Sequence, residues 1–148
     1  MKILIDADGC PVVSQTVSIA GENNIEVLIF CDTSHIFNID GAETVTVSKG
    51  ADSVDFALVN RAQRGDIVVT QDYGLSAMAL SKGAVPITQN GLVIDDNNIT
   101  MLLTSRYESK KARQAGHRLK GPKKRSSEND KAFCESLERV INTKRKHL

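Results

Sequence analysis

The stretch ILIDADGCP, residues 3–11, decides the fold of this chain. Its first three residues form an apolar run that needs cover on both faces, which is typical of a strand in a parallel sheet. The run passes directly into a D-x-D-G turn that carries Asp6 and Asp8. In open α/β sheets, ligands bind just beyond the carboxyl ends of the strands, and both aspartates fall at that place. The stretch therefore predicts an α/β sheet with a functional site at the end of its first strand.

Strand and helix patterns alternate along the rest of the chain, as they do in βαβ units. Further strands are expected at 25–30, 43–47, 67–70 and 84–88, with a short extended segment at 92–94. Helices are expected at 11–23, 51–64, 74–82, 97–114 and 127–144. Pro11 suits the first position of the first helix, and Gly83 suits the end of the third. The pattern predicts a Rossmann-like three-layer sandwich whose mostly parallel sheet has the order 3-2-1-4-5, with strands numbered along the chain.

Asp6 and Asp8 repel each other unless a proton or a cation lies between them. The divalent ions that suit such oxygen ligands are Mg²⁺ and Mn²⁺. An aspartate before glycine is also common in turns and at helix caps, which accounts for Asp8 better than for Asp6. We therefore interpret the pair as a candidate metal site.

Three further aspartates are candidates for the same site. Asp72 follows the fourth strand, which neighbours the first strand at the switch point of the predicted sheet. Asp52 and Asp55 share one face of the first turn of the 51–64 helix, where helix capping is an equal alternative for Asp52. We predict that the catalytic residues are Asp6, Asp8, Asp55 and Asp72, and that one or two Mg²⁺ or Mn²⁺ ions are held by Asp6, Asp8, Asp52 and Asp72. Such ions activate a water molecule and stabilise the charge on a phosphodiester.

The net charge of +1 conceals an asymmetry along the chain. Residues 1–105 contain 5 Lys and Arg against 13 Asp and Glu, whereas residues 106–148 contain 14 against 5. The split predicts an acidic catalytic body at 1–105 and a basic loop and helical extension at 106–148, packed on the same domain. The apolar residues expected to anchor this C-terminal part are Met101, Leu102, Phe133, Leu137 and Val140.

A polyanion is the expected partner of the basic segment, because its lysines and arginines gather around a glycine-containing loop that can reach phosphates. The predicted nucleic-acid contacts are Arg113, His117, Arg118, Lys120, Lys123, Lys124 and Arg125. Aromatic residues make up only 4% of the chain, and it has no tryptophan. Base stacking is therefore poorly supplied, and we expect recognition of the backbone and shape of a nucleic acid.

The three cysteines lie far apart and form neither a zinc spacing nor a disulfide framework. Cys10, beside the aspartate pair, is expected to be a small buried residue and not a nucleophile. No apolar run approaches the roughly 20 residues of a membrane span, and the chain begins with its first strand, so we expect no signal peptide. These features predict a cytoplasmic protein with no membrane partner.

Four segments resemble the YaiI/YqxD family of bacterial proteins: DADGCP at 6–11, KGADSVDFALVNRA at 49–62, VVTQDYGLSAMAL at 68–80 and GHRLKGPKK at 116–124. That family is grouped with the PIN-like domains, metal-dependent ribonucleases of Rossmann-like architecture that often form homodimers. The resemblance covers nearly the whole chain. It matches Asp6 to the first-strand acid of PIN-like domains, Asp52 or Asp55 to the acid at the start of the central helix, and Asp72 to the acid after the fourth strand. The further acid that many PIN domains place shortly afterwards is absent from 74–80.

Two other functions remain open from the sequence. An apolar strand followed by D-x-D-G also begins phosphatases of the haloacid dehalogenase type, in which Asp6 would be the nucleophile and Asp8 an acid/base. The metal pair would then be Asp95 and Asp96. Against this function, Cys10 stands where a hydroxyl residue is expected, and the chain is short for a core plus a cap. The other alternative is a non-catalytic RNA-binding module whose acids bind metal for structure only.

Overall fold

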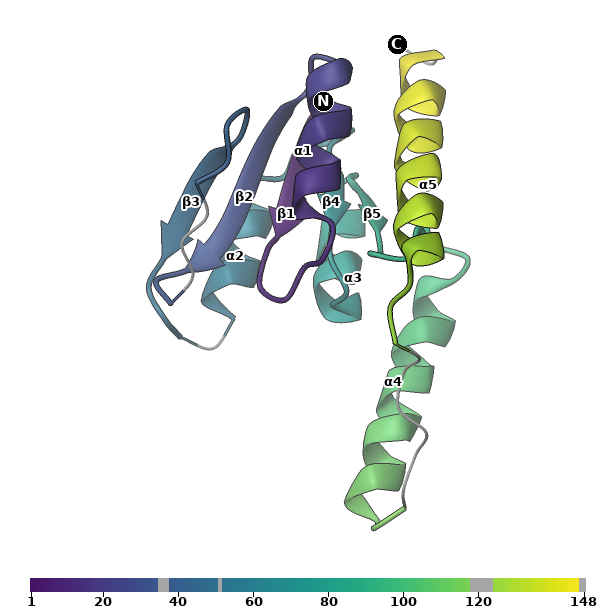
Figure 1. Ribbon diagram of the computed structural model, residues 1–148. Coiled ribbons are helices and arrows are strands. Elements are labelled where there is room, and N and C mark those ends of the chain that lie inside the picture. The colour runs from purple at the N-terminus through teal and green to yellow at the C-terminus, as the bar shows by residue number, and fades with distance from the viewer. Residues whose placement is uncertain (35–37, 51, 118–123, 147–148) are drawn as a thin grey trace.

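The computed structural model describes residues 1–34, 38–50, 52–117 and 124–146 of the chain. One sheet of five strands lies at the centre, in the order β3-β2-β1-β4-β5, and every neighbouring pair is parallel. Helices cover both faces of this sheet (Figure 1). The predicted strand order and three-layer α/β architecture are therefore confirmed, and the sheet is parallel throughout.

The five strands are β1 (Lys2–Asp6), β2 (Glu26–Asp32), β3 (Glu43–Val47), β4 (Ile67–Val69) and β5 (Val85–Ile87). The five helices are α1 (Val13–Glu22), α2 (Ser53–Arg61), α3 (Tyr73–Ser81), α4 (Ile99–Gln114) and α5 (Ser127–Lys146). The segment predicted at 92–94 forms only an isolated antiparallel bridge between Val93 and Ile87. Among the described helices, none is long and apolar enough to cross a membrane.

The sheet separates two hydrophobic clusters, because successive side chains of a strand point to opposite faces. Ile3 and Ile5 of β1 point toward α1 and α5. On that face, α5 contributes three fully buried side chains: Phe133, Leu137 and Ile141. Leu4 of β1 points to the opposite face, where it packs with residues of α2 and α3. Burial on both faces explains why the strands are apolar throughout, as parallel strands are.

Two helix boundaries differ from the prediction for identifiable reasons. Helix α1 begins at Val13, so Pro11 lies before the helix and not at its first position. The intervening residues form a turn, in which Gly9 has φ +69° and the Cys10 amide donates to the Ala7 carbonyl. Helix α2 ends at Arg61 instead of residue 64, because the chain then turns so that buried Asp66 accepts hydrogen bonds from two backbone amides.

The end of α3 follows the prediction. Gly83 has φ +80°, and its amide donates to the Leu80 carbonyl, while the next amide, of Ala84, donates to the Ala79 carbonyl. These two bonds make a Schellman motif, which favours glycine because the left-handed conformation strains other residues. The motif turns the chain directly into β5.

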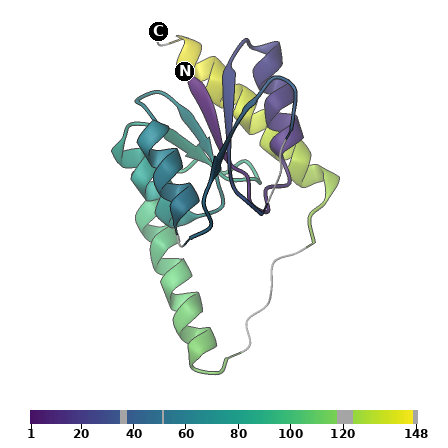
Figure 2. The same cartoon turned by 90° about the vertical axis from the view of Figure 1, so that its left-hand side faces the viewer.

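Helix α4 packs against α3 and then extends well beyond the rest of the molecule (Figures 1 and 2). None of its residues is buried. The expectation that Met101 anchors this segment is wrong, since its side chain is 64% exposed. Three consecutive helical residues point to three different directions, so only part of the apolar run at 101–103 can face α3.

Candidate active site

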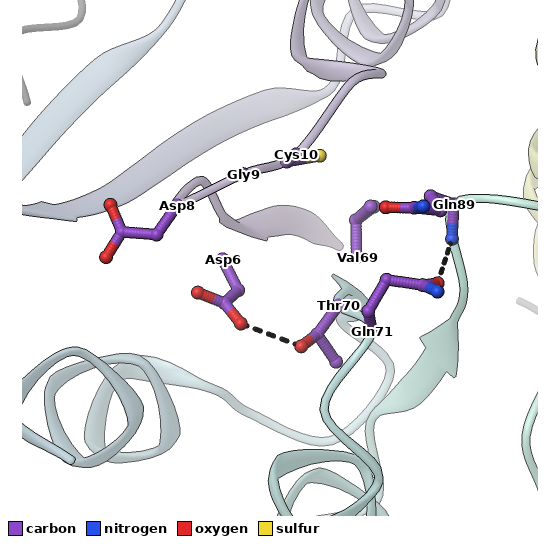
Figure 3. Close-up of a pocket in the computed structure, with 8 residues that line it drawn as sticks. All are labelled: Asp6, Asp8, Gly9, Cys10, Val69, Thr70, Gln71 and Gln89. Atoms are coloured by element: carbon purple, nitrogen blue, oxygen red, sulfur yellow. Dashed lines mark hydrogen bonds between the residues drawn. The ribbon is translucent and has the colours of Figure 1, made fainter. Parts of the chain in front are cut away.

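At the carboxyl end of β1, Asp6 lies beside Thr70, a buried residue that directly follows β4. Asp6 is the last residue of β1, and the register that pairs Ile5 with Val69 places Thr70 next to it. Thr70 Oγ1 donates a hydrogen bond to Asp6 Oδ2 at 2.8 Å (Figure 3). The same hydroxyl oxygen accepts from the Asp72 amide at 3.0 Å. Since Thr70 is only 3% exposed, this hydroxyl holds the Asp6 carboxylate in a fixed orientation.

A small pocket of about 70 Å³ lies directly beside Asp6. Figure 3 shows Asp6 and Asp8 on one side of it and two glutamines on the other. The side-chain oxygen Oε1 of Gln71 accepts a hydrogen bond from the Gln89 amide at 2.8 Å, which ties these two segments together. The volume suits water or a small ion and is too small for a nucleotide.

A wider pocket of about 390 Å³ lies where α2, α3 and α4 meet. Its lining residues are Asp52, Asp55, Phe56, Asp72, Gly74, Leu75, Met78 and Arg106. The five predicted acids are therefore divided between two pockets: Asp6 and Asp8 line the small one, and the other three line the wide one. The wide pocket has the volume of a typical small-molecule site.

Asp72 follows β4, as the sequence suggests, and also caps the next helix. It lies three residues beyond the end of β4 and is the N-cap of α3. Its Oδ1 accepts from the amides of Gly74 and Leu75, at 2.8 and 3.2 Å. The same oxygen lies 3.3 Å from a terminal nitrogen of Arg106 on α4. Thus Thr70, and not Asp72, is the neighbour of Asp6 across the strands, while Asp72 joins α3 to α4.

Asp52 and Asp55 lie at the start of α2. Asp52 is the N-cap residue with φ +61°, yet its side chain makes no capping hydrogen bond. Burial raises the pKa of Asp55 from 3.8 to about 6, with smaller contributions from the negative charges of Asp72, Asp6 and Asp52, and Arg106 opposes the rise. Asp55 is therefore partly protonated near neutral pH, which is unusual for an aspartate.

The pKa of Asp6 is raised as well. Burial is the largest cause; the hydrogen bond from Thr70 opposes it, and the charges of Asp8 and Asp72 add to it. Because Asp6 and Asp55 are each perturbed by carboxylates of the other pocket, the two pockets form a single electrostatic site. Carboxylates that raise each other's pKa values favour a bound cation.

The oxygen donors present suit Mg²⁺ or Mn²⁺, but they do not form a closed metal cage. Within residues 1–34, 38–50, 52–117 and 124–146, no group of three or more His, Cys, Asp or Glu side chains is arranged to hold a metal ion. Mg²⁺ usually keeps several of its waters and takes only one or two protein carboxylates. The arrangement therefore fits a hydrated ion beside Asp6 better than the predicted set of four protein ligands.

The predicted phosphate contacts have different surroundings. Arg113 and His117 are exposed at the far end of α4, and Lys124 is exposed before α5. Arg125 donates instead to Asp130, to Asn90 and to the Gln89 carbonyl, so its guanidinium holds α5 against the loop after β5. Three further predicted contacts lie outside the described residues: Arg118, Lys120 and Lys123.

The residues required for a dehalogenase-type phosphatase are not brought together. Asp95 Oδ1 accepts from the amides of Asn97 and Asn98 before α4, and neither Asp95 nor Asp96 lines the two acidic pockets. Burial also raises the pKa of the Cys10 thiol, which keeps it protonated and unreactive.

Two features of the site were not predicted from the sequence: the hydrogen bond from Thr70 to Asp6 and the ion pair between Arg106 and Asp72. Thr70 was recognisable in principle, because it ends the apolar run of the strand that neighbours β1. Arg106 was assigned to the basic segment, since a contact across 34 residues leaves no local pattern.

Comparisons with known proteins identify close relatives along the whole chain. The sequence profile described as "Uncharacterized BCR, YaiI/YqxD family" matches residues 4–143. A UPF0178 protein of Exiguobacterium sibiricum is 51% identical over 144 residues, covering 97% of this chain and 99% of the relative. UPF0178 proteins of Clostridium acetobutylicum and Clostridium tetani are 49% and 42% identical, covering 95% and 99% of this chain and 97% and 100% of their own lengths. No solved structure matches.

Proposed function

The chain belongs to the YaiI/YqxD family, and we propose that it is a metal-dependent ribonuclease that hydrolyses phosphodiester bonds at the carboxyl edge of its sheet. The observation that supports this most directly is the environment of Asp6. It lies at the end of a buried strand, is oriented by Thr70, and has a pKa raised by burial and by neighbouring carboxylates. Strand-end carboxylates that favour a cation are what metal-assisted phosphodiester hydrolysis requires.

The proposed roles follow from the geometry. A bound Mg²⁺ or Mn²⁺ would activate the attacking water and neutralise charge on the phosphate. Asp6 would hold the ion, since Thr70 already orients its carboxylate. Asp55, with its pKa of about 6, is suited to accept a proton from the attacking water near neutral pH. Arg106, on the opposite wall of the wide pocket, would bind the phosphate through its exposed guanidinium.

The substrate class rests on the positive charge near the site. Helix α4 carries Arg106, Lys110, Lys111 and Arg113 against the single acid Glu108. These side chains are exposed, so they can contact phosphates without first breaking a buried structure. A polyanion bound along α4 would reach the wide acidic pocket at the point where Arg106 meets Asp72.

A second candidate function is a non-catalytic RNA-binding module. Two observations favour it: Asp72 already serves as a helix cap and partner of Arg106, and the described residues contain no preassembled metal cage. In that case, the acids would set the local charge and would not carry out a reaction.

The deciding experiment measures cleavage of labelled single-stranded and duplex RNA across a titration of Mn²⁺ and of Mg²⁺. Asp6→Asn is compared with Glu26→Gln, a matched control whose exposed acid lies at the amino end of β2, at the opposite edge of the sheet. We expect metal-dependent cleavage that falls on the order of 100-fold or more in Asp6→Asn and is unchanged in Glu26→Gln. Full cleavage by Asp6→Asn would refute the active site, and binding without cleavage at any metal concentration would establish the second candidate.

A further inference from the structure

Exposed large apolar side chains occur on both α2 and α4, two helices that contact α3. In the described chain, the exposed large apolar residues of α2 and α4 are Phe56, Met101, Leu103 and Tyr107, and the two aromatic rings are 58% and 66% exposed. Single exposed apolar residues are ordinary. Phe56, however, lines the wide acidic pocket together with Arg106, whereas Tyr107 is not among its lining residues.

Phe56 is placed to contact a ligand of the wide pocket. It lines that pocket one residue after Asp55 and faces the solvent on the α2 side. On the α4 side, Arg106 lines the same pocket, and its terminal nitrogen lies 3.3 Å from Asp72 Oδ1. An aromatic ring and a guanidinium thus line one pocket together with three aspartates.

The charge of α4 indicates what binds there. The helix carries four basic residues and only one acid, Glu108. Three of the basic residues, Lys110, Lys111 and Arg113, lie beyond Tyr107. A second copy of this chain is a poor partner, because symmetric pairing of α4 with itself would bring these like charges together. A ligand that combines negative charge with flat apolar groups matches both features, and unpaired RNA provides phosphates and bases in alternation.

We propose that the ring of Phe56 is a stacking platform for an unpaired RNA base at the wide pocket, beside Arg106, whose guanidinium would bind the adjoining phosphate. The proposal depends on the ribonuclease function for its substrate class and adds the groups that select an unpaired strand. It also revises the expectation of pure backbone recognition, since one exposed ring beside a guanidinium is enough to stack a base. In a duplex the bases are stacked on one another, so the platform disfavours paired RNA.

The platform is tested by binding, separately from cleavage. Fluorescence anisotropy with a labelled oligoadenylate, in EDTA, is compared with an abasic oligonucleotide of the same length and charge. Phe56→Ala is expected to weaken oligoadenylate binding by about tenfold and to leave abasic binding unchanged. Leu92→Ala, which removes another exposed apolar side chain (43% exposed) outside the platform, is the matched control and is expected to bind both ligands like the unmodified chain.

A second variant reports on stacking directly. The chain has no tryptophan, so Phe56→Trp introduces a single fluorophore at the platform. We expect its fluorescence to be quenched by oligoadenylate and not by the abasic strand. The platform would be overturned if Phe56→Ala weakened the affinity for both ligands equally or left the affinity for oligoadenylate unchanged. A shift of the monomer–dimer equilibrium by Phe56→Ala in sedimentation would also overturn it.

The two proposals fail in different ways. If the unmodified protein and Phe56→Ala cleave RNA with the same KM, the platform is refuted and the nuclease stands. If base-dependent binding is lost in Phe56→Ala but no metal supports cleavage, the platform stands and the ribonuclease function is refuted.

Discussion

The acidic edge of the sheet and helix α4 carry opposite charges and are constructed in opposite ways. Asp6 ends a strand whose three preceding residues are fully buried, and a buried threonine holds its carboxylate. Helix α4 has no buried residue and extends beyond the body (Figure 2). Asp6 is therefore positioned by strand register and core packing, whereas the distal basic side chains of α4, Lys110, Lys111 and Arg113, are exposed on a helix without buried residues.

The contrast also divides the C-terminal part of the chain, which the charge pattern presents as one basic unit. Helix α5 carries five basic residues against four acids, and its Phe133, Leu137 and Ile141 are fully buried in the core shared with β1. Helix α4 carries four basic residues against one acid and has no such anchors. The positive charge of the C-terminal part therefore does not tell which of its segments belong to the folded core.

Removing the same side chain from each helix tests this contrast most strongly. Leu137→Ala in α5 is expected to lower the free energy of unfolding by about 2–5 kcal/mol, because it opens a cavity in the core. Leu103→Ala in α4, at a position that is 36% exposed, is expected to change it by no more than about 0.5 kcal/mol. Urea denaturation followed by far-ultraviolet circular dichroism measures both. Equal losses would show that α4 is as much a part of the core as α5.

The features that could be predicted from the sequence are those determined by local pattern. The apolar runs at 3–5 and 67–69 are continuous, which identifies buried parallel strands, and the order of the sheet then places Asp6 at its switch point. Gly83 was predicted correctly for the same reason, since only a local left-handed conformation is needed there.

The features that could not be predicted depend on contacts between distant segments. Asp72 follows β4 as the sequence suggests, but its ion pair with Arg106 of α4 joins residues 34 positions apart. Arg125 looks like a phosphate contact, but its partners include Asn90 and Gln89, which are 35 and 36 residues away. No periodicity or spacing reports such pairings, because they arise only when the folded chain brings the two segments together.

The raised pKa of Asp55 at the acidic edge predicts the next largest change in stability. Asp55 binds a proton more tightly in the folded state than in the unfolded state, because its pKa rises from 3.8 to about 6. Stability therefore decreases as the pH rises from about 4 to about 6, where the unfolded chain has already lost this proton. Asp55→Asn removes the half-buried negative charge, and we expect it to raise the free energy of unfolding at pH 7 by about 1–2 kcal/mol after screening by solvent.

The measurement is urea denaturation between pH 4 and pH 7 for the unmodified chain, Asp55→Asn and the distant control Glu26→Gln. The difference in stability between Asp55→Asn and the unmodified chain should grow across the pH window and be near zero at pH 4. A constant difference at every pH would mean that packing, and not charge, accounts for the effect. Addition of Mg²⁺ should stabilise the unmodified chain more than Asp55→Asn if the ion relieves the repulsion at this edge.

The smallest expected change in stability, and the sharpest test of α4, comes from neutralising its distal charges. Because Lys110, Lys111 and Arg113 are exposed on a helix without buried residues, their joint replacement by alanine should change the free energy of unfolding by no more than about 0.5 kcal/mol. The same variant should lower the slope of log affinity for single-stranded RNA against log salt concentration by about 2, since each lost phosphate contact removes roughly 0.7.

Removal of three charges from α5, at Lys131, Arg139 and Lys146, is the matched control and should leave that slope unchanged. If both triple variants flatten the slope equally, the bound strand does not follow α4; if the α4 variant unfolds at clearly lower urea, its basic side chains support the fold and the contrast with the acidic edge is wrong.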